Sequence, residues 1–210
     1  MRIKVCGLTR EEDVRLACRL GAWAVGFVFA PLSPRRVDLK QAARLRAAVA
    51  PGVLSVGVFE DGLTPEIEAA VAACRLDAVQ LHGVWPLSFE LCTVTVFRAL
   101  GLSRGRLAPV LSQRVSGVLV EPSRTAADRS AGRRLPLDDQ RWAWSQALEL
   151  KRGGLITIVA GGLNVENVGD AVAASRPDAV DVSSGVESAL GVKDEGKLKA
   201  FFKAAAQGVV

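Results

Sequence analysis

Short runs of apolar residues alternate along the chain with longer segments in which apolar and polar residues recur at helical spacing. Eight such runs predict strands, at residues 3–6, 24–29, 54–59, 78–81, 94–100, 117–120, 155–160 and 179–184. Because these runs are apolar on both faces, we expect buried parallel strands covered by helices. The segments between them predict helices, although Gly105 and Pro109 interrupt the pattern near residues 104–113.

The count of repeating units predicts the fold class. Eight strands, each followed by a helix or helix-like segment, are typical of an α/β protein of the (β/α)8 TIM barrel type. A doubly wound open sheet is the alternative, but eight consecutive units without a break favour a closed barrel. No linker or low-complexity tract divides the 210 residues, so we expect one barrel domain over residues 1–210.

Local signals mark where several helices begin and end. Thr9 with Glu12 predicts a capping box before the first helix, and Gly21 predicts a left-handed residue at its end. Asn164 is expected to open the helix that follows the seventh strand.

Composition indicates the cellular compartment and excludes some classes of site. Half of the residues are hydrophobic, but no apolar run approaches the length of a membrane span, and the N-terminus lacks the layout of a signal peptide. We therefore expect a cytoplasmic protein. The four cysteines contain no CxxC pair, so neither a zinc site nor a disulfide framework is predicted, and Cys18 and Cys74 are interpreted as core residues.

The net charge of +5 includes an arginine-rich stretch at residues 123–134. Charge alone permits nucleic-acid binding. A basic chain with few aromatic residues fits a small anionic substrate as well or better, and charge does not separate the two interpretations.

Two glycine-rich loops follow the last two strands. Gly161 and Gly162 come after the seventh strand, and Ser183, Ser184 and Gly185 come after the eighth. Glycines let backbone N–H groups approach an anion, and TIM barrels commonly bind phosphate at these two loops. Two such loops on consecutive strands favour a phosphate site over a pair of ordinary turns.

A further basic loop follows the second strand. Its two prolines stiffen the chain around Arg35 and Arg36. A guanidinium held on a stiff loop suits a carboxylate or a phosphate. We expect one of these arginines to face the site and the other to face solvent.

Three more polar side chains lie at the carboxyl ends of predicted strands. His82, the only histidine, is a candidate substrate contact. Glu121 ends the sixth strand; it is either a salt-bridged structural group or a general acid with a raised pKa. Asp181 alternates with apolar neighbours and so points inward. Its carboxylate could there make either a structural hydrogen bond or a contact with the substrate.

Cys6 stands at the end of the first strand, directly before Gly7. On the rim that carries the phosphate loops, a thiol near arginines and backbone N–H groups is expected to be held partly as thiolate. It could act as a nucleophile or as a general base. Because the chain shows no catalytic Ser/His/Asp or Cys/His motif, we favour the general base.

Six motifs together resemble the phosphoribosylanthranilate isomerase family of tryptophan biosynthesis. They are KVCGLTR (4–10), GFVFAPLSPRRV (26–37), VGVF (56–59), VQLHG (79–83), AGGLNVENV (160–168) and VDVSSGVE (180–187) with GVKD (191–194). The resemblance implies a barrel enzyme that converts N-(5-phosphoribosyl)anthranilate to 1-(2-carboxyphenylamino)-1-deoxyribulose 5-phosphate by an Amadori rearrangement, without cofactor or metal.

The resemblance also implies roles for individual residues. Cys6 falls on the base that removes the ribose C2′ proton, and Arg35 on the residue that holds the anthranilate carboxylate. The phosphate loops coincide with the two glycine-rich segments. Glu121 stands where the family has an aspartate as general acid, and the loop after it departs from the family pattern. The extra methylene displaces the carboxyl group, and misplacement of that size costs on the order of 10²-fold in rate.

Three functions are therefore open. The first is an active isomerase that takes a small phosphorylated substrate, as a monomer or homodimer, with no nucleic-acid or membrane partner. The second, motivated by the altered loop, is a related phosphosugar isomerase with another substrate preference. The third is a barrel that binds phosphorylated ligands without catalysis, and Cys6 argues against it because a binding protein needs no thiol there.

Overall fold

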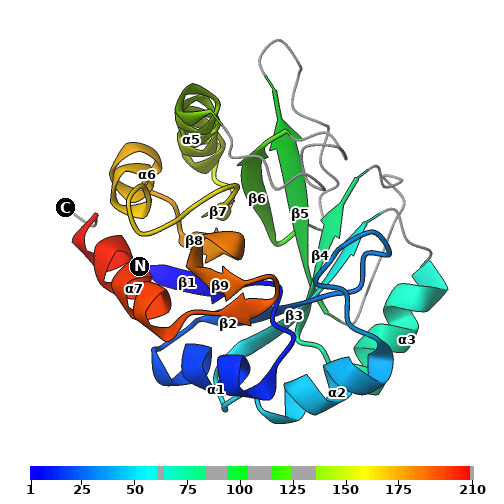
Figure 1. Cartoon of the computed structure of the whole chain (residues 1–210). Coiled ribbons are helices and arrows are strands. Elements are labelled where there is room, and N and C mark those ends of the chain that lie inside the picture. The colour runs from blue at the N-terminus through cyan, green and yellow to red at the C-terminus, as the bar shows by residue number, and fades with distance from the viewer. Residues whose placement is uncertain (61–63, 84–93, 104–114, 124–135, 209–210) are drawn as a thin grey trace.

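A computed structural model describes residues 1–60, 64–83, 94–103, 115–123 and 136–208 of the chain. Parallel strands close into a barrel in sequence order, and β1 pairs with both β2 and β8 (Figure 1). The strands are β1 (Arg2–Val5), β2 (Ala24–Val28), β3 (Leu54–Glu60), β4 (Ala78–His82), β5 (Thr95–Leu102), β6 (Gly117–Pro122), β7 (Thr157–Val159) and β8 (Ala179–Val182). The predicted TIM barrel is confirmed, and the open doubly wound sheet is excluded.

Helices lie outside the barrel and connect its strands (Figure 1). They are α1 (Glu11–Arg19), α2 (Leu39–Ala47), α3 (Thr64–Cys74), α5 (Leu137–Arg152), α6 (Val168–Ser175) and α7 (Glu195–Gln207). After β8 the chain forms a short 3-10 turn, η1 (Ser184–Val186), and a small antiparallel hairpin of β9 (Glu187–Ala189) and β10 (Val192–Lys193). The helix predicted near residues 104–113 lies outside the described residues.

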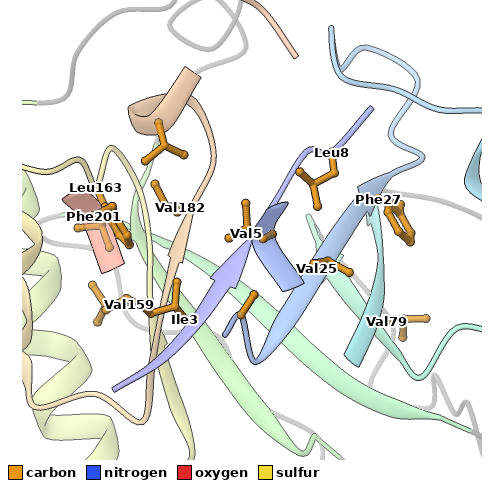
Figure 2. Packing of buried hydrophobic residues seen from close by; sticks show 14 of the residues in the cluster. Ile3, Val5, Leu8, Val25, Phe27, Val79, Val159, Leu163, Val182 and Phe201 are labelled. Atoms are coloured by element: carbon orange, nitrogen blue, oxygen red, sulfur yellow. The ribbon is translucent and has the colours of Figure 1, made fainter. Parts of the chain in front are cut away.

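Alternation along β1 separates the core from the barrel interior. Ile3 and Val5 are buried in the layer between strands and helices, and Figure 2 shows Val5 beside Val25 of β2. Because successive side chains of a strand point to opposite faces, Lys4 and Cys6 point into the barrel.

The floor of the barrel interior is apolar. Its buried side chains are small or aliphatic except for one phenylalanine: Ala24, Val56, Ala78, Phe97, Ala99, Leu119, Ile158, Ala160 and Ala179. Interior polar groups such as Lys4, Gln80 and Asp181 come from positions nearer the carboxyl ends of the strands. The floor therefore limits the site to one end of the barrel, the end at which TIM-barrel enzymes act.

The structure corrects two predicted helix starts. Arg10 is the N-cap residue of α1 and makes no side-chain capping bond, while Thr9 Oγ1 donates to the carbonyl oxygen of Gly191 at 2.7 Å. The helix after β7 begins at Val168; Asn164 instead forms a turn in which its Oδ1 accepts from the backbone N–H groups of Glu166 and Asn167. Gly21, with a φ of +85°, follows α1 as expected.

Candidate active site

Cys6 directly follows β1 rather than ending it, and its backbone N–H still donates to the carbonyl of Val182 at 2.8 Å. The side chain is 7% exposed and packs beside Val28 and Val58. A Cβ on Gly26 would lie only 2.8 Å from Cys6 Sγ, so the glycine of β2 makes the space that the thiol occupies.

A buried ion pair lies next to this thiol. Lys4 has no exposed surface, and its Nζ donates to Asp181 Oδ1 at 2.9 Å. Burial by itself would lower the pKa of Lys4, but the charges of Asp181 and Cys6 raise it above its ordinary value. Lys4 and Asp181 therefore act as counter-ions inside the barrel, although burial raises the pKa of the Asp181 carboxyl above its ordinary value.

The thiol of Cys6 is less acidic than the sequence suggests. Burial raises the pKa of the Cys6 thiol above its ordinary value, although Lys4 and Lys193 act in the opposite direction. The expectation of a partly ionised thiolate was wrong for the free protein, because sequence position shows nearby cations but not the loss of water around the sulfur.

Arg35 faces the site and Arg36 is exposed, as expected for two neighbouring residues on a stiff loop. The Arg35 guanidinium donates to both carboxylate oxygens of Glu187, at 2.7 Å from Nε and 2.6 Å from Nη2. A Cβ on Gly7 would lie 2.5 Å from Arg35 Cδ and 2.9 Å from Ser183 Oγ. The loops after β1, β2 and β8 therefore meet at Gly7.

The two predicted phosphate loops touch each other. A Cβ on Gly185 would lie 1.9 Å from the carbonyl oxygen of Leu163, so only a glycine allows the loop after β8 to approach the loop after β7. Gly161 and Gly162 have φ angles of +86° and +80°, a region that other residues rarely adopt. These two adjoining loops, residues 161–163 and 183–185, are called the cradle below.

His82 and Glu121 lie together on the β4 and β6 side of the barrel mouth. Gln80 Nε2 is 2.7 Å from His82 Nε2, and His82 Nδ1 is 3.5 Å from Glu121 Oε1. Gln80 thus meets one ring nitrogen of His82, and the other, Nδ1, faces Glu121. A Cβ on Gly161 would approach Glu121 Cβ to 2.9 Å, so Glu121 also borders the cradle.

The structure was also searched for metal ligands and membrane helices. Within the described ranges, no three His, Cys, Asp or Glu side chains are grouped so that they could hold a metal ion. None of the helices in those ranges is long and apolar enough to cross a membrane.

Comparisons with known proteins identify the family. The model of the N-(5′-phosphoribosyl)anthranilate (PRA) isomerase family matches residues 3–204. This chain belongs to that family. The enzyme of that name from Myxococcus xanthus is 40% identical over 214 residues, covering 98% of this chain and 96% of its own length.

Solved structures of phosphoribosylanthranilate isomerases agree with this assignment. The enzyme of Thermus thermophilus superposes with a TM-score of 0.83 at 36% identity, covering 98% of both chains. Another isomerase, in complex with reduced 1-(o-carboxyphenylamino)-1-deoxyribulose 5-phosphate, has a TM-score of 0.80 at 33% identity and the same coverage. The resemblance read from the motifs is confirmed, and with it the isomerase class and the place in tryptophan biosynthesis.

Sequence reasoning missed several polar residues of this isomerase's site, namely Lys4, Gln80, Glu187 and Lys193. Alternation along the first and fourth predicted strands places Lys4 and Gln80 on the inward face and could have indicated them. Glu187 and Lys193 stand in the motifs VDVSSGVE and GVKD, but no local pattern links them to Arg35.

Proposed function

We propose that this family member converts N-(5′-phosphoribosyl)anthranilate to 1-(2-carboxyphenylamino)-1-deoxyribulose 5-phosphate, with Cys6 as general base and Glu121 as general acid. The observation that carries the proposal is the convergence at residues 6 and 7. Gly7, the residue after Cys6, lies against both Arg35, for a carboxylate, and Ser183 of the phosphate cradle. The carboxylate, the phosphate and the reacting carbon of the substrate thus have separate, adjacent binding positions.

The reaction begins at the ribose ring oxygen. Glu121 donates a proton to that oxygen, the C1′–O bond breaks, and the nitrogen lone pair forms a C=N bond to C1′. Cys6 then removes the proton from C2′, the electron pair forms a C1′–C2′ double bond, and the pair of the C=N bond returns to nitrogen to give an enolamine. Tautomerisation to the C2′ ketone, with a proton added at C1′, completes an isomerisation that leaves no net redox change.

The remaining site residues bind the substrate. The backbone N–H groups and hydroxyls at Gly161, Gly162, Ser183, Ser184 and Gly185 bind the 5-phosphate, since the two loops form one cradle. Among the residues that the structure describes, Asp181 has a hydrogen-bond partner only on Oδ1, so Oδ2 is available to a ribose hydroxyl. His82 contacts the ribose and orients Glu121 through Nδ1.

His82 lies beside the carboxyl group of Glu121. A glutamate reaches one methylene further than the family's aspartate, and His82 Nδ1 lies 3.5 Å from Glu121 Oε1, close enough to position the longer side chain.

We further propose a cytoplasmic protein, a monomer or homodimer, with a small phosphorylated substrate and no nucleic-acid partner.

The direct test is the fluorescence decay of freshly made phosphoribosylanthranilate after addition of purified protein. The proposed function predicts enzyme-dependent decay that is saturable in substrate and inhibited by the reduced product analogue. A phosphorylated aminoaldose without the anthranilate group serves as the competing substrate. Absence of decay, or faster turnover of the competitor, would contradict the proposal in favour of a binding barrel or a different isomerase.

A further inference from the structure

The guanidinium of Arg35 is held along one edge. Nε and Nη2 donate to Oε1 and Oε2 of Glu187, a bidentate pair in which the side chains are 18% and 7% exposed. Bidentate pairing fixes the plane of the guanidinium as well as its position. The loop of Arg35 and the hairpin of Glu187 are 152 residues apart in the chain, so this pair joins two elements that only the fold brings together.

The other edge of the same guanidinium is open. Within the described part of the chain no hydrogen bond involves Arg35 Nη1, and Nη2 has a second N–H beyond the one given to Glu187. Nη1 and Nη2 together form an edge that matches a second carboxylate. A lysine could not do this, because it lacks a planar fork with two separate edges.

Lys193 prevents Glu187 from cancelling the positive charge of Arg35. Its Nζ, which has no exposed surface, lies 2.9 Å from Glu187 Oε1 and donates to the carbonyl of Ser183 at 3.0 Å. With Lys193 protonated, two cations surround one carboxylate and the cluster carries a net charge of +1, although burial lowers the pKa of Lys193 below its ordinary value. Burial would raise the pKa of Glu187, but the hydrogen bond from Arg35 and the charge of Lys193 hold it below its ordinary value.

The hairpin that carries this cluster is fixed to the barrel. Thr9 Oγ1 donates to Gly191 in the hairpin turn at 2.7 Å. The backbone N–H of Lys193 donates to Asp13 of α1 at 3.1 Å, and Lys197 Nζ of α7 donates to the Glu187 carbonyl at 2.7 Å. Three independent contacts therefore hold Glu187 at a set distance from the strand ends.

We propose that Glu187 and Lys193 are positioning residues that present the open edge of Arg35 to the substrate carboxylate and set its spacing from the phosphate cradle. This rests on the proposed function, in which Arg35 binds the anthranilate carboxylate. Glu187 orients the guanidinium, while Lys193 neutralises Glu187 and ties it to the carbonyl of Ser183 in the cradle. The pair determines specificity for a carboxylated ring without touching the substrate.

The test compares two probes on the full chain. One is reduced 1-(o-carboxyphenylamino)-1-deoxyribulose 5-phosphate, and the other is the same molecule without the ring carboxylate. For Glu187→Gln we expect the Kd of the carboxylated probe to rise about 10-fold or more, since a charge-assisted bidentate contact is disturbed. The Kd of the other probe changes less than about twofold, and KM rises more than kcat falls.

Two further variants keep the test decisive. Asp178→Asn breaks the Lys151–Asp178 pair, 2.9 Å long and beside the start of β8, and serves as a matched control that lowers thermal stability without changing the preference between probes. If Glu187→Gln does not fold, Glu187→Asp keeps the charge and withdraws the carboxylate by one methylene. This variant is expected to weaken binding of the carboxylated probe selectively.

The outcomes separate this inference from the proposed function. If Arg35→Ala loses the preference for the carboxylated probe but both Glu187 variants keep it, the positioning role is overturned and the proposed function stands. If Arg35→Ala keeps the preference, the carboxylate assignment itself fails, and this inference fails with it. If the Glu187 variants weaken the binding of both probes equally, the hairpin has only a structural role, and the inference is also overturned.

Discussion

Lys4 Nζ lies 2.9 Å from Asp181 Oδ1 inside the barrel, and the register of β1 and β8 places these two residues directly side by side. Next along the inward face of the chain from Lys4 is Cys6, so the thiol has a cation and an anion as near neighbours. Lys4 favours the thiolate that a general base requires, and Asp181 opposes it. The balance between them, together with burial, determines how basic the sulfur is.

Breaking this pair is expected to destabilise the fold strongly. Lys4→Met leaves the Asp181 carboxylate buried without its cation, and removing one partner of a buried pair typically costs about 3–5 kcal/mol of unfolding free energy. Urea denaturation at neutral pH measures this. The double variant Lys4→Met with Asp181→Leu is expected to recover much of the loss, because no buried charge is left. A single variant as stable as the parent chain would contradict the ion pair.

Turnover should depend on Cys6 far more than ligand binding does. For Cys6→Ser we expect near-complete loss of kcat, since a serine hydroxyl is a much weaker base than a thiol near neutral pH. Affinity for the reduced product analogue should stay within about a few-fold because the shape of the site is kept. Titration of the analogue alongside the fluorescence assay checks both. Retention of most of the parental kcat would show that another group is the base.

The pH profile should show a base with a raised pKa. Burial lifts the pKa of the Cys6 thiol above its ordinary value of 9.0, so the thiolate fraction of the free protein is small at neutral pH and grows as pH rises. We therefore expect the rate of Cys6 alkylation by iodoacetamide, located by mass spectrometry, to increase with pH into the alkaline range. An alkylation rate already level from pH 6 would contradict this.

The two arginines of the loop after β2 should differ sharply. Arg35→Ala is expected to raise KM by the equivalent of about 1.5–3 kcal/mol, the value of a hydrogen bond to a charged group. Arg36→Ala, at an exposed position of the same loop, is the matched control and should change KM little. Steady-state kinetics on phosphoribosylanthranilate compares them. A larger effect at Arg36 would reverse the assignment.

Glu121 should behave as the general acid despite the family's aspartate at that position. Glu121→Gln is expected to lower kcat by about 10²-fold or more, within the range of general acid catalysis. Glu121→Asp should also be slower than the parent, because it withdraws the carboxyl from His82 Nδ1, now 3.5 Å away. Asp128, an acidic residue in the arginine-rich stretch after Glu121, is the alternative acid and lies outside the described residues. Near-normal turnover of Glu121→Gln with an inactive Asp128→Asn would move the acid to Asp128.

Several features followed from sequence alone because they depend on local pattern and on topology. Apolar runs separated by helical segments predicted the strands, and their number predicted the closed barrel. Since the carboxyl ends of parallel strands meet at one end of a barrel, residues as distant as Cys6 and Gly185 could be assigned to one site. The opposite orientations of Arg35 and Arg36 also followed, because adjacent residues on a stiff loop diverge.

Other features were decided only by tertiary structure, because they depend on contacts that no local pattern encodes. Asp181 lies 177 residues from Lys4, and Glu187 lies 152 residues from Arg35. Thr9 satisfies the requirements for a capping box, but the hairpin turn at Gly191 offers its hydroxyl a carbonyl acceptor instead. The pKa of Cys6 was misjudged for the same reason: charge can be read along a chain, whereas the removal of water from a side chain depends on everything that packs around it.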